Sequence, residues 1–191
     1  MNDYRSIFYQ VITDPDYYFS IPWGKPRRGH PEGSVAAHIV HLEFNLEKMR
    51  AVLPELVMMN VWKFKLLIHT HDTFKKDAIH GKGTADPQNH AHLARNFLAR
   101  YCDDADLLNM VLYHDEGYNI WKQKQRGEEW ESRFERLLKT INDWDVFMAF
   151  CIIDATTPGK EKFAIAWFFE EVMKKKIIPL GESLRLFLSE Q

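Results

Sequence analysis

The sequence has few cysteines, no excess of positive charge and no long apolar run, and each lack excludes a class of protein. Its 191 residues contain only two cysteines, Cys102 and Cys151, so the spacings of a zinc knuckle or a redox-active Cys-x-x-Cys pair are missing. Cys151 lies in an apolar stretch and is expected to be a buried small hydrophobe. The net charge of −2 argues against a domain that binds nucleic acid through bulk positive charge.

Segments that would direct the chain to another compartment are also lacking. Residues 1–5 do not show the basic-then-apolar pattern of a secretory signal. No apolar run approaches the length needed to cross a membrane, so no membrane partner is expected. These observations predict a protein of the reducing cytoplasm.

What the chain does have is apolar residues at helical spacing. Its 46% apolar and 27% charged residues are typical of a globular protein, and its length suits one domain over residues 1–191. One apolar stripe consists of Val35, Ile39, Leu42, Leu46 and Met49. No segment shows a convincing strand-like alternation, so the pattern predicts a compact all-α domain of about six to eight helices.

The expected helices follow from caps, apolar stripes and chain breaks. They cover approximately residues 4–11, 34–51, 54–72, 89–101, 103–114, 128–141, 143–154, 160–176 and 179–188. Asp103 and Asp143 are expected to cap two of these helices. The rest of residues 1–33 is expected to be irregular, because Asp14-Pro15-Asp16 is a turn signal. Residues 77–88 are expected to be a loop, and residues 118–130 an exposed connection with at most a helical turn.

Six side chains with the chemistry of metal ligands lie in or near these helices. The set consists of His38, His71, Asp72, His90, His114 and Asp154. At its centre an apolar run ends in the adjacent pair His71-Asp72. Imidazole and carboxylate are ligands that first-row transition metals bind readily, and the set is large enough for two ions. The pattern therefore predicts a metal site built from distant parts of the chain.

This ordered set resembles the HD-domain metal-dependent phosphohydrolases. The likeness rests on residues 29–38 (Gly-His-Pro-Glu-Gly-Ser-Val-Ala-Ala-His), on His71-Asp72-x-x-Lys75, and on the later His and Asp residues of the set. It covers roughly residues 29–160, and residues 31–38 are similar to the start of the HD domain attached to some tRNA nucleotidyltransferases. The resemblance implies an HD-type helical bundle that hydrolyses a phosphate ester.

The resemblance also implies a role for each ligand. Asp72 would bridge two ions, because a carboxylate has two oxygens whereas an imidazole offers one lone pair. With His71 and Asp72 at the centre, the first ion would be completed by His38 and Asp154, and the second would be held by His90 and His114. Lys75 would neutralise a phosphate oxygen, while a metal-bound water would attack phosphorus. The nitrogen-rich set favours one or two ions of Mn, Fe, Co or Zn over Mg.

Three further residues are candidate contacts for the substrate, namely Arg28, His92 and Lys160. A solvated surface loop is an equally good interpretation of the segment that holds Arg28. His92 is also a rival of His90 as a ligand, because a His-x-His pair can itself chelate a metal.

Other His and acidic residues near the set have structural interpretations. His41 is a lesser rival of His38, and His69 falls on a different face from His71, so it is expected to be structural. Asp115 and Glu116 follow His114 and are expected to support a ligand or to lie on the surface.

Three functions are compatible with this ligand pattern. The first is a phosphohydrolase that acts on a nucleotide or a related phosphate monoester or diester, which is what the resembled family usually does. The second is a di-iron oxygenase similar to myo-inositol oxygenase, which uses the same ligands, and the third is a regulatory domain that binds metal without turnover. The phosphohydrolase is the expected function, and its partner is expected to be a small phosphorylated molecule. The sequence carries no signature of a particular substrate.

Overall fold

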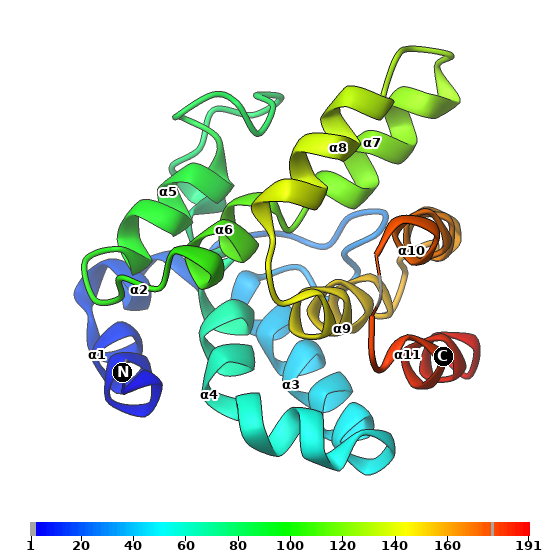
Figure 1. Ribbon diagram of the computed structural model, residues 1–191. Coiled ribbons are helices and arrows are strands. Elements are labelled where there is room, and N and C mark those ends of the chain that lie inside the picture. The colour runs from blue at the N-terminus through cyan, green and yellow to red at the C-terminus, as the bar shows by residue number, and fades with distance from the viewer. Residues whose placement is uncertain (1–2, 177) are drawn as a thin grey trace.

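Helices form all the regular structure of the computed structural model, which describes residues 3–176 and 178–191 (Figure 1). The elements are α1 (Tyr4–Thr13), α2 (Pro15–Ser20), α3 (Val35–Val52), α4 (Pro54–Thr70), the 3-10 turn η1 (Thr73–Lys76), α5 (His90–Leu98), α6 (Ala105–Tyr113), α7 (Glu116–Gln125), α8 (Glu131–Thr140), α9 (Trp144–Ala155), α10 (Phe163–Lys175) and α11 (Gly181–Ser189). Within the described ranges no β-strand occurs, and only two isolated bridges form. The predicted all-α class is confirmed, although the eleven α-helices exceed the expected six to eight.

The extra helices lie where irregular chain was expected. α2 begins at the supposed turn, because the Asp14 side chain accepts a hydrogen bond from the Asp16 backbone N–H and Pro15 occupies the first helical position. The same residue types that signal a turn can thus also start a helix. The expected exposed connection over residues 118–130 contains most of α7, which buries Gly117 and Ile120 despite its charged composition.

One predicted cap is wrong by one residue. Asp104, rather than Asp103, caps α6, since its side chain accepts hydrogen bonds from the backbone N–H groups of Asp106 and Leu107. Asp143 caps α9 as predicted, accepting from the Val146 backbone N–H. Neighbouring aspartates carry equal capping chemistry, so the sequence cannot distinguish the two at α6.

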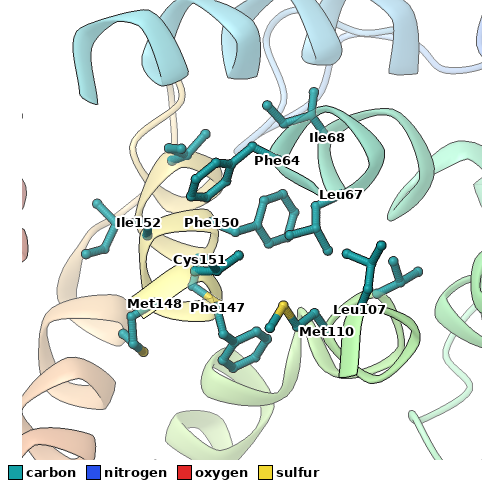
Figure 2. Close-up of a cluster of buried hydrophobic side chains, with 14 of the residues drawn as sticks. Phe64, Leu67, Ile68, Leu107, Met110, Phe147, Met148, Phe150, Cys151 and Ile152 are labelled. Carbon is teal, nitrogen blue, oxygen red and sulfur yellow. The ribbon is translucent and has the colours of Figure 1, made fainter. Parts of the chain in front are cut away.

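The core is built around α9, which packs against α3, α4, α10 and α11. Its residues 146–150 and 152–153 are completely buried. Figure 2 shows side chains of α4 and α6 meeting those of α9, with Phe64 and Leu67 facing Phe150, and Met110 near Phe147. The burial of these large side chains stabilises the arrangement of the three helices by roughly 1.5–3 kcal/mol for each side chain.

The three core helices present polar residues at their C-terminal ends. α4 ends at Thr70, directly before the His71-Asp72 pair, and α6 ends at Tyr113, directly before His114. Asp154 lies in the last turn of α9. Because a helix C-terminus carries partial negative charge, this convergence creates an environment that favours a cation.

A close approach between α7 and α10 gives the first testable prediction. A Cβ added at Gly117 would lie 2.7 Å from Cδ1 of Phe168, a ring that is fully buried and cannot move aside. Gly117→Ala is therefore expected to lower the free energy of unfolding by about 1–3 kcal/mol, even though alanine favours a helix. Urea unfolding would measure the change.

Gly83→Ala is the matched control, because a Cβ there would meet no atom within 4 Å. Its free energy of unfolding should change by less than about 0.5 kcal/mol. If the two variants unfolded at the same urea concentration, α7 and α10 would not be packed as described.

Candidate metal centre

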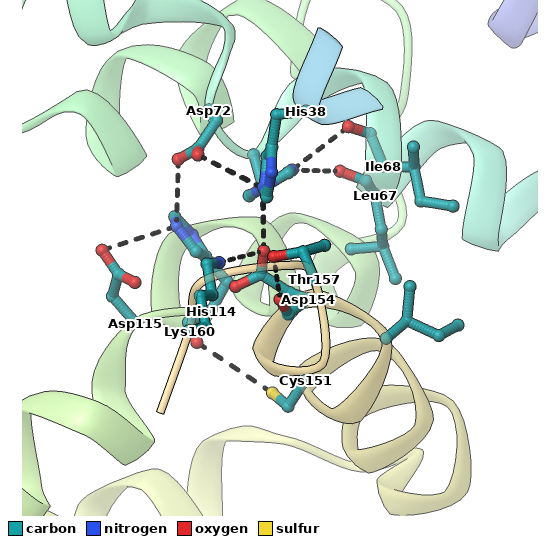
Figure 3. Close-up of polar contacts among 12 residues, drawn as sticks. His38, Leu67, Ile68, Asp72, His114, Asp115, Cys151, Asp154, Thr157 and Lys160 are labelled. Carbon is teal, nitrogen blue, oxygen red and sulfur yellow. Dashed lines mark hydrogen bonds and ion pairs between the residues drawn. The ribbon is translucent and has the colours of Figure 1, made fainter. Parts of the chain in front are cut away.

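The six predicted ligands come together in one buried cluster. Figure 3 shows four of them, His38, Asp72, His114 and Asp154, turned toward one another. Their positions are His38 in α3, His71 and Asp72 directly after α4, His90 at the start of α5, His114 directly after α6 and Asp154 in the last turn of α9. Up to 116 residues separate contacting members of the set, as between His38 and Asp154. The convergence of helix ends thus gathers side chains that are far apart in the sequence.

A first group of ligand atoms surrounds Oδ2 of Asp72. The distance to Nε2 of His71 is 3.5 Å and that to Nε2 of His38 is 3.9 Å. Asp154 Oδ1 lies 2.9 Å from His38 Nε2 and 3.9 Å from His71 Nε2. Atoms that bind one tetrahedral ion at about 2.0–2.2 Å lie about 3.4 Å apart, so this spacing is suited to a shared cation.

A second group surrounds the other oxygen of the same carboxylate. Oδ1 of Asp72 lies 3.5 Å from Nε2 of His90 and 3.6 Å from Nε2 of His114. The two imidazole nitrogens are 3.3 Å apart. Because each oxygen of Asp72 faces a different group of imidazoles, this residue has the placement of a carboxylate that bridges two cations.

Asp115 adds a carboxylate to the second group that was not assigned there from the sequence. Its Oδ2 lies 3.4 Å from His90 Nε2 and 3.6 Å from His114 Nε2. It was expected to support a ligand or to lie on the surface, whereas the structure places it as close to the imidazoles as Asp72. The available signal was the dipeptide His114-Asp115, which repeats the His71-Asp72 pair at the end of another apolar helix.

Backbone carbonyls orient two of the histidines. Nδ1 of His71 donates to the carbonyl oxygens of Leu67 and Ile68, at 3.0 and 3.2 Å, and Nδ1 of His114 donates to that of Val111 at 2.8 Å. A neutral imidazole whose proton is on Nδ1 presents a lone pair at Nε2. Both rings therefore direct lone pairs toward carboxylate oxygens, an arrangement that is repulsive unless a proton or a metal cation lies between them.

Two atoms at the centre of the cluster have no partner of their own. His71 Nε2 and Asp72 Oδ1 are fully buried and form no hydrogen bond. An unsatisfied buried acceptor costs about 1–3 kcal/mol, and a bound cation would remove that cost. The donor set of imidazole and carboxylate thus fits a transition metal at both groups.

Glu32 lies behind the first group and was not assigned from the sequence. Its Oε1 is 2.9 Å from Nδ1 of His30 and 3.1 Å from Nδ1 of His38, and its side chain is almost completely buried. Its hydrogen bond is with His30, and His38 Nδ1 forms none, but a carboxylate this close to Nδ1 favours the proton on that nitrogen and so keeps the Nε2 lone pair for a metal. Glu32 therefore has the position of a residue that orients the ligand His38.

Two lysines contact the carboxylates of the first group. Lys75 donates to Asp72 Oδ2, and Lys160 donates to Asp154 Oδ1 at 2.6 Å. Burial alone would raise the pKa of Asp72, but Lys75 and His71 hold that pKa well below its usual value. The pKa of Asp154 is likewise held low against the effect of burial, chiefly by Lys160 and His38. Both carboxylates are thus ionised at neutral pH and able to bind a cation.

The two oriented histidines differ in proton affinity. Burial lowers the pKa of His71 to about 3, despite the nearby charge of Asp72. Burial also opposes the charging of His114, but Asp115 and Asp72 outweigh it and raise the pKa of His114 to about 9. At neutral pH the first group is therefore free of a proton on His71, whereas the second group holds one on His114.

This difference predicts that metal affinity depends on pH at the second group but not, through His71, at the first. A metal at the second group must displace the His114 proton, so its affinity is expected to rise about tenfold per pH unit between pH 6 and 8 and to level off near pH 9. His71 binds no proton in this range, so it adds no such dependence at the first group. Calorimetric titration with Mn²⁺ at several pH values would measure both affinities, and equal, pH-independent affinities would contradict this assignment.

The remaining candidates are placed less centrally. Arg28 and Lys160 line a cavity beside the cluster, and Arg28 also pairs with Glu161 at 3.0 Å. Among the described residues, those that line this cavity do not include His92, which is half-buried on α5. His41 belongs to none of the potential ligand groups found in the described chain.

His69 has partners away from the cluster, as expected for a structural residue. Its Nδ1 lies 2.6 Å from the hydroxyl of Tyr17, and its Nε2 lies 3.2 Å from Oε1 of Glu43. The ring therefore joins α2, α3 and α4 instead of facing His71.

The cavity beside the cluster has a volume of about 650 Å³. Its polar lining includes Arg28, His30, Asp72, Lys75, His114, Asp115, Asn119, Asp154, Lys160 and Glu161. Its apolar lining includes Tyr118, Trp121, Phe163, Ile165 and Phe168. This size suits a small organic molecule, and the polar lining places part of such a molecule next to the candidate ligands.

Comparison with family models, curated proteins and solved structures finds no match for this chain. In the described residues, no helix combines the length and the apolar character needed to cross a membrane. What the structure establishes is an all-helical fold with a buried cluster of His and Asp side chains that could hold metal. The cluster includes His38, His71, Asp72, His90 and His114.

Proposed function

We propose that this protein is a metal-dependent phosphohydrolase of the HD-domain type, which hydrolyses a phosphate ester with a metal-activated water. The observation that carries the proposal is the position of Asp72, whose two oxygens face two separate groups of imidazole nitrogens. His38, His71 and Asp154 would hold one ion with Asp72. His90, His114 and Asp115 would hold the other.

The chemistry of the ligands indicates the metal and its contribution. The ligands combine imidazole nitrogen with carboxylate oxygen, which favours Mn, Fe, Co or Zn over Mg. Two such ions, when bound, would polarise the phosphoryl group of the substrate and lower the pKa of a bound water to about 7.

The cations of the cavity would bind the phosphate. Lys75 and Lys160 line the cavity and contact the ligand carboxylates, so they lie next to the position of the reacting phosphoryl group. Arg28 lies in the same lining with its side chain largely exposed. Each of these cations is paired with a carboxylate of the lining, and metal ions bound to Asp72 and Asp154 would leave Lys75 and Lys160 free to pair with an anionic phosphate, which a neutral polyol could not offer.

A screen of phosphate monoesters and diesters on protein loaded with Mn²⁺ tests the proposal. Turnover should appear with metal, disappear with a chelator and return when Mn²⁺ is added back. Asp72→Asn is the inactive control, because an amide can no longer offer two anionic oxygens to two ions. Oxygen uptake by iron-loaded protein would support the oxygenase instead, and bound metal without any turnover would support a regulatory domain.

A further inference from the structure

Aromatic side chains contribute to the lining of the cavity beside the metal cluster. Tyr118 and Trp121 come from α7, and Phe163 comes from the first position of α10. Tyr118 is 52% exposed and Phe163 is 74% exposed, which is high for such large apolar rings. Exposed aromatic rings in the lining of a cavity are a common feature of a ligand-binding surface.

These three residues, Tyr118, Trp121 and Phe163, are called the aromatic wall, and two of their rings have a defined mutual geometry. The rings of Tyr118 and Trp121 are stacked, with centroids 6.0 Å apart and an interplanar angle of 25°. Lys122 lies over the Tyr118 ring, with Nζ 5.3 Å from its centroid. α7 packs against α10, where Gly117 leaves room for the Phe168 ring, so the two helices that carry these aromatic residues are in direct contact.

The same cavity is also lined by charged groups of the candidate metal centre. Lys75 and Lys160 contact the candidate ligands there, and a phosphoryl group bound to them would fill only a small part of the 650 Å³. The rest of the substrate must then extend along the aromatic wall. Two further polar groups of the lining already have partners, since Glu161 pairs with Arg28 and Asn119 donates to Thr84.

We infer that the substrate is a phosphate ester whose organic part carries a flat aromatic ring, which stacks on the wall formed by Tyr118, Trp121 and Phe163. This inference rests on the proposed function, because it assumes that the phosphoryl group binds at the metal cluster. A ring offers its face to the aromatic side chains, whereas a polyol would lose hydrogen bonds to water that these side chains cannot replace.

Two substrates with similar alkoxide leaving groups test the inference, namely benzyl phosphate and glycerol phosphate. The Mn-loaded protein should show a kcat/KM for benzyl phosphate at least about tenfold above that for glycerol phosphate. Phe163→Ala should raise KM for benzyl phosphate about 5- to 10-fold and leave that for glycerol phosphate within about twofold. Trp121→Leu, which keeps apolar bulk but removes the flat ring, should act in the same direction.

Phe19→Ala is the matched control, because Phe19 is similarly exposed, at 68%, and lies outside the cavity lining. It should leave both KM values unchanged. Binding of benzylphosphonate, which cannot be hydrolysed, would be followed by tryptophan fluorescence of the Mn-loaded protein.

The outcomes separate this inference from the proposed function. Equal hydrolysis of the two esters, or an equal effect of Phe163→Ala and Phe19→Ala, would overturn the aromatic subsite and leave the hydrolase intact. Tight binding of benzylphosphonate that is weakened by Phe163→Ala, without turnover of either ester, would support the subsite and count against the hydrolase. Absence of both binding and turnover would overturn both.

Discussion

Replacing His71 with alanine is expected to remove the activity and most of the bound metal, whereas replacing His69 with alanine should preserve both at least in part. His71 directs its Nε2 lone pair into the cluster, at 3.5 Å from Asp72 and 3.9 Å from Asp154, and it is completely buried. Loss of one central ligand should lower the turnover rate more than about 100-fold, since even residues that only support metal ligands typically matter 10- to 100-fold.

His69 is a stringent control, because it is the same residue type only two positions away. Its ring contacts Tyr17 and Glu43 instead of the cluster, so His69→Ala should lower stability more than metal content. Elemental analysis and turnover of both variants, with circular dichroism to confirm folding, would measure the contrast. Equal metal loss in two folded variants would mean that the His71-Asp72 pair is not the centre of the site.

Replacing His114 with alanine is expected to remove one of two ions. His114 Nε2 faces only the second group, with His90, Asp115 and Oδ1 of Asp72 as neighbours. The first group keeps His38, His71, Asp154 and the other oxygen of Asp72. The variant should therefore bind one ion per chain, with activity reduced at least about 100-fold if both ions act on the phosphoryl group.

His92→Ala is the control for the second ion. His92 was the rival of His90 in the sequence, but it lies outside the potential ligand groups of the described residues. This variant should keep two ions. Mass spectrometry of the metal-saturated His114→Ala and His92→Ala variants would measure the number of ions bound per chain. Loss of an ion from His92→Ala but not from His114→Ala would mean that His92, and not His114, is a ligand of the second ion.

The gathering of the candidate ligands could be predicted because His71, His114 and Asp154 each belong to an apolar segment that is expected to be buried in the core. The runs before His71 and His114, and the run that contains Asp154, are strongly hydrophobic, so α4, α6 and α9 must pack together. Polar side chains at the ends of such helices must share one environment. Their roles as metal ligands remain a prediction, which the experiments above test.

The residues that the sequence did not assign act through geometry that a linear pattern does not contain. Glu32 lies in a Pro/Gly-rich loop, and nothing in its spacing shows that its carboxylate will meet Nδ1 of His38. Asp115 was expected to be a supporting or surface group, since an acidic residue after a helix is usually solvated. Only the fold shows that its carboxylate turns back toward His90.

The two unexpected helices illustrate a different limit. At α2, the Asp-Pro sequence fits both a turn and a helix start, and the packing of the buried Tyr17 side chain decides between them. At α7, charged residues obscure a short buried face that only α10 completes, through Gly117 and Phe168. In both cases a tertiary contact overrides the local signal.

The metal content of the saturated wild-type protein tests the central claim most directly. The claim is that Asp72 bridges two metal ions, each held by a separate group of imidazoles. Mass spectrometric elemental analysis, after incubation with excess Mn²⁺ and removal of unbound metal by gel filtration, should give two ions per chain. A value that stays at one would contradict the bridging role of Asp72, and a value of zero would contradict the metal centre itself.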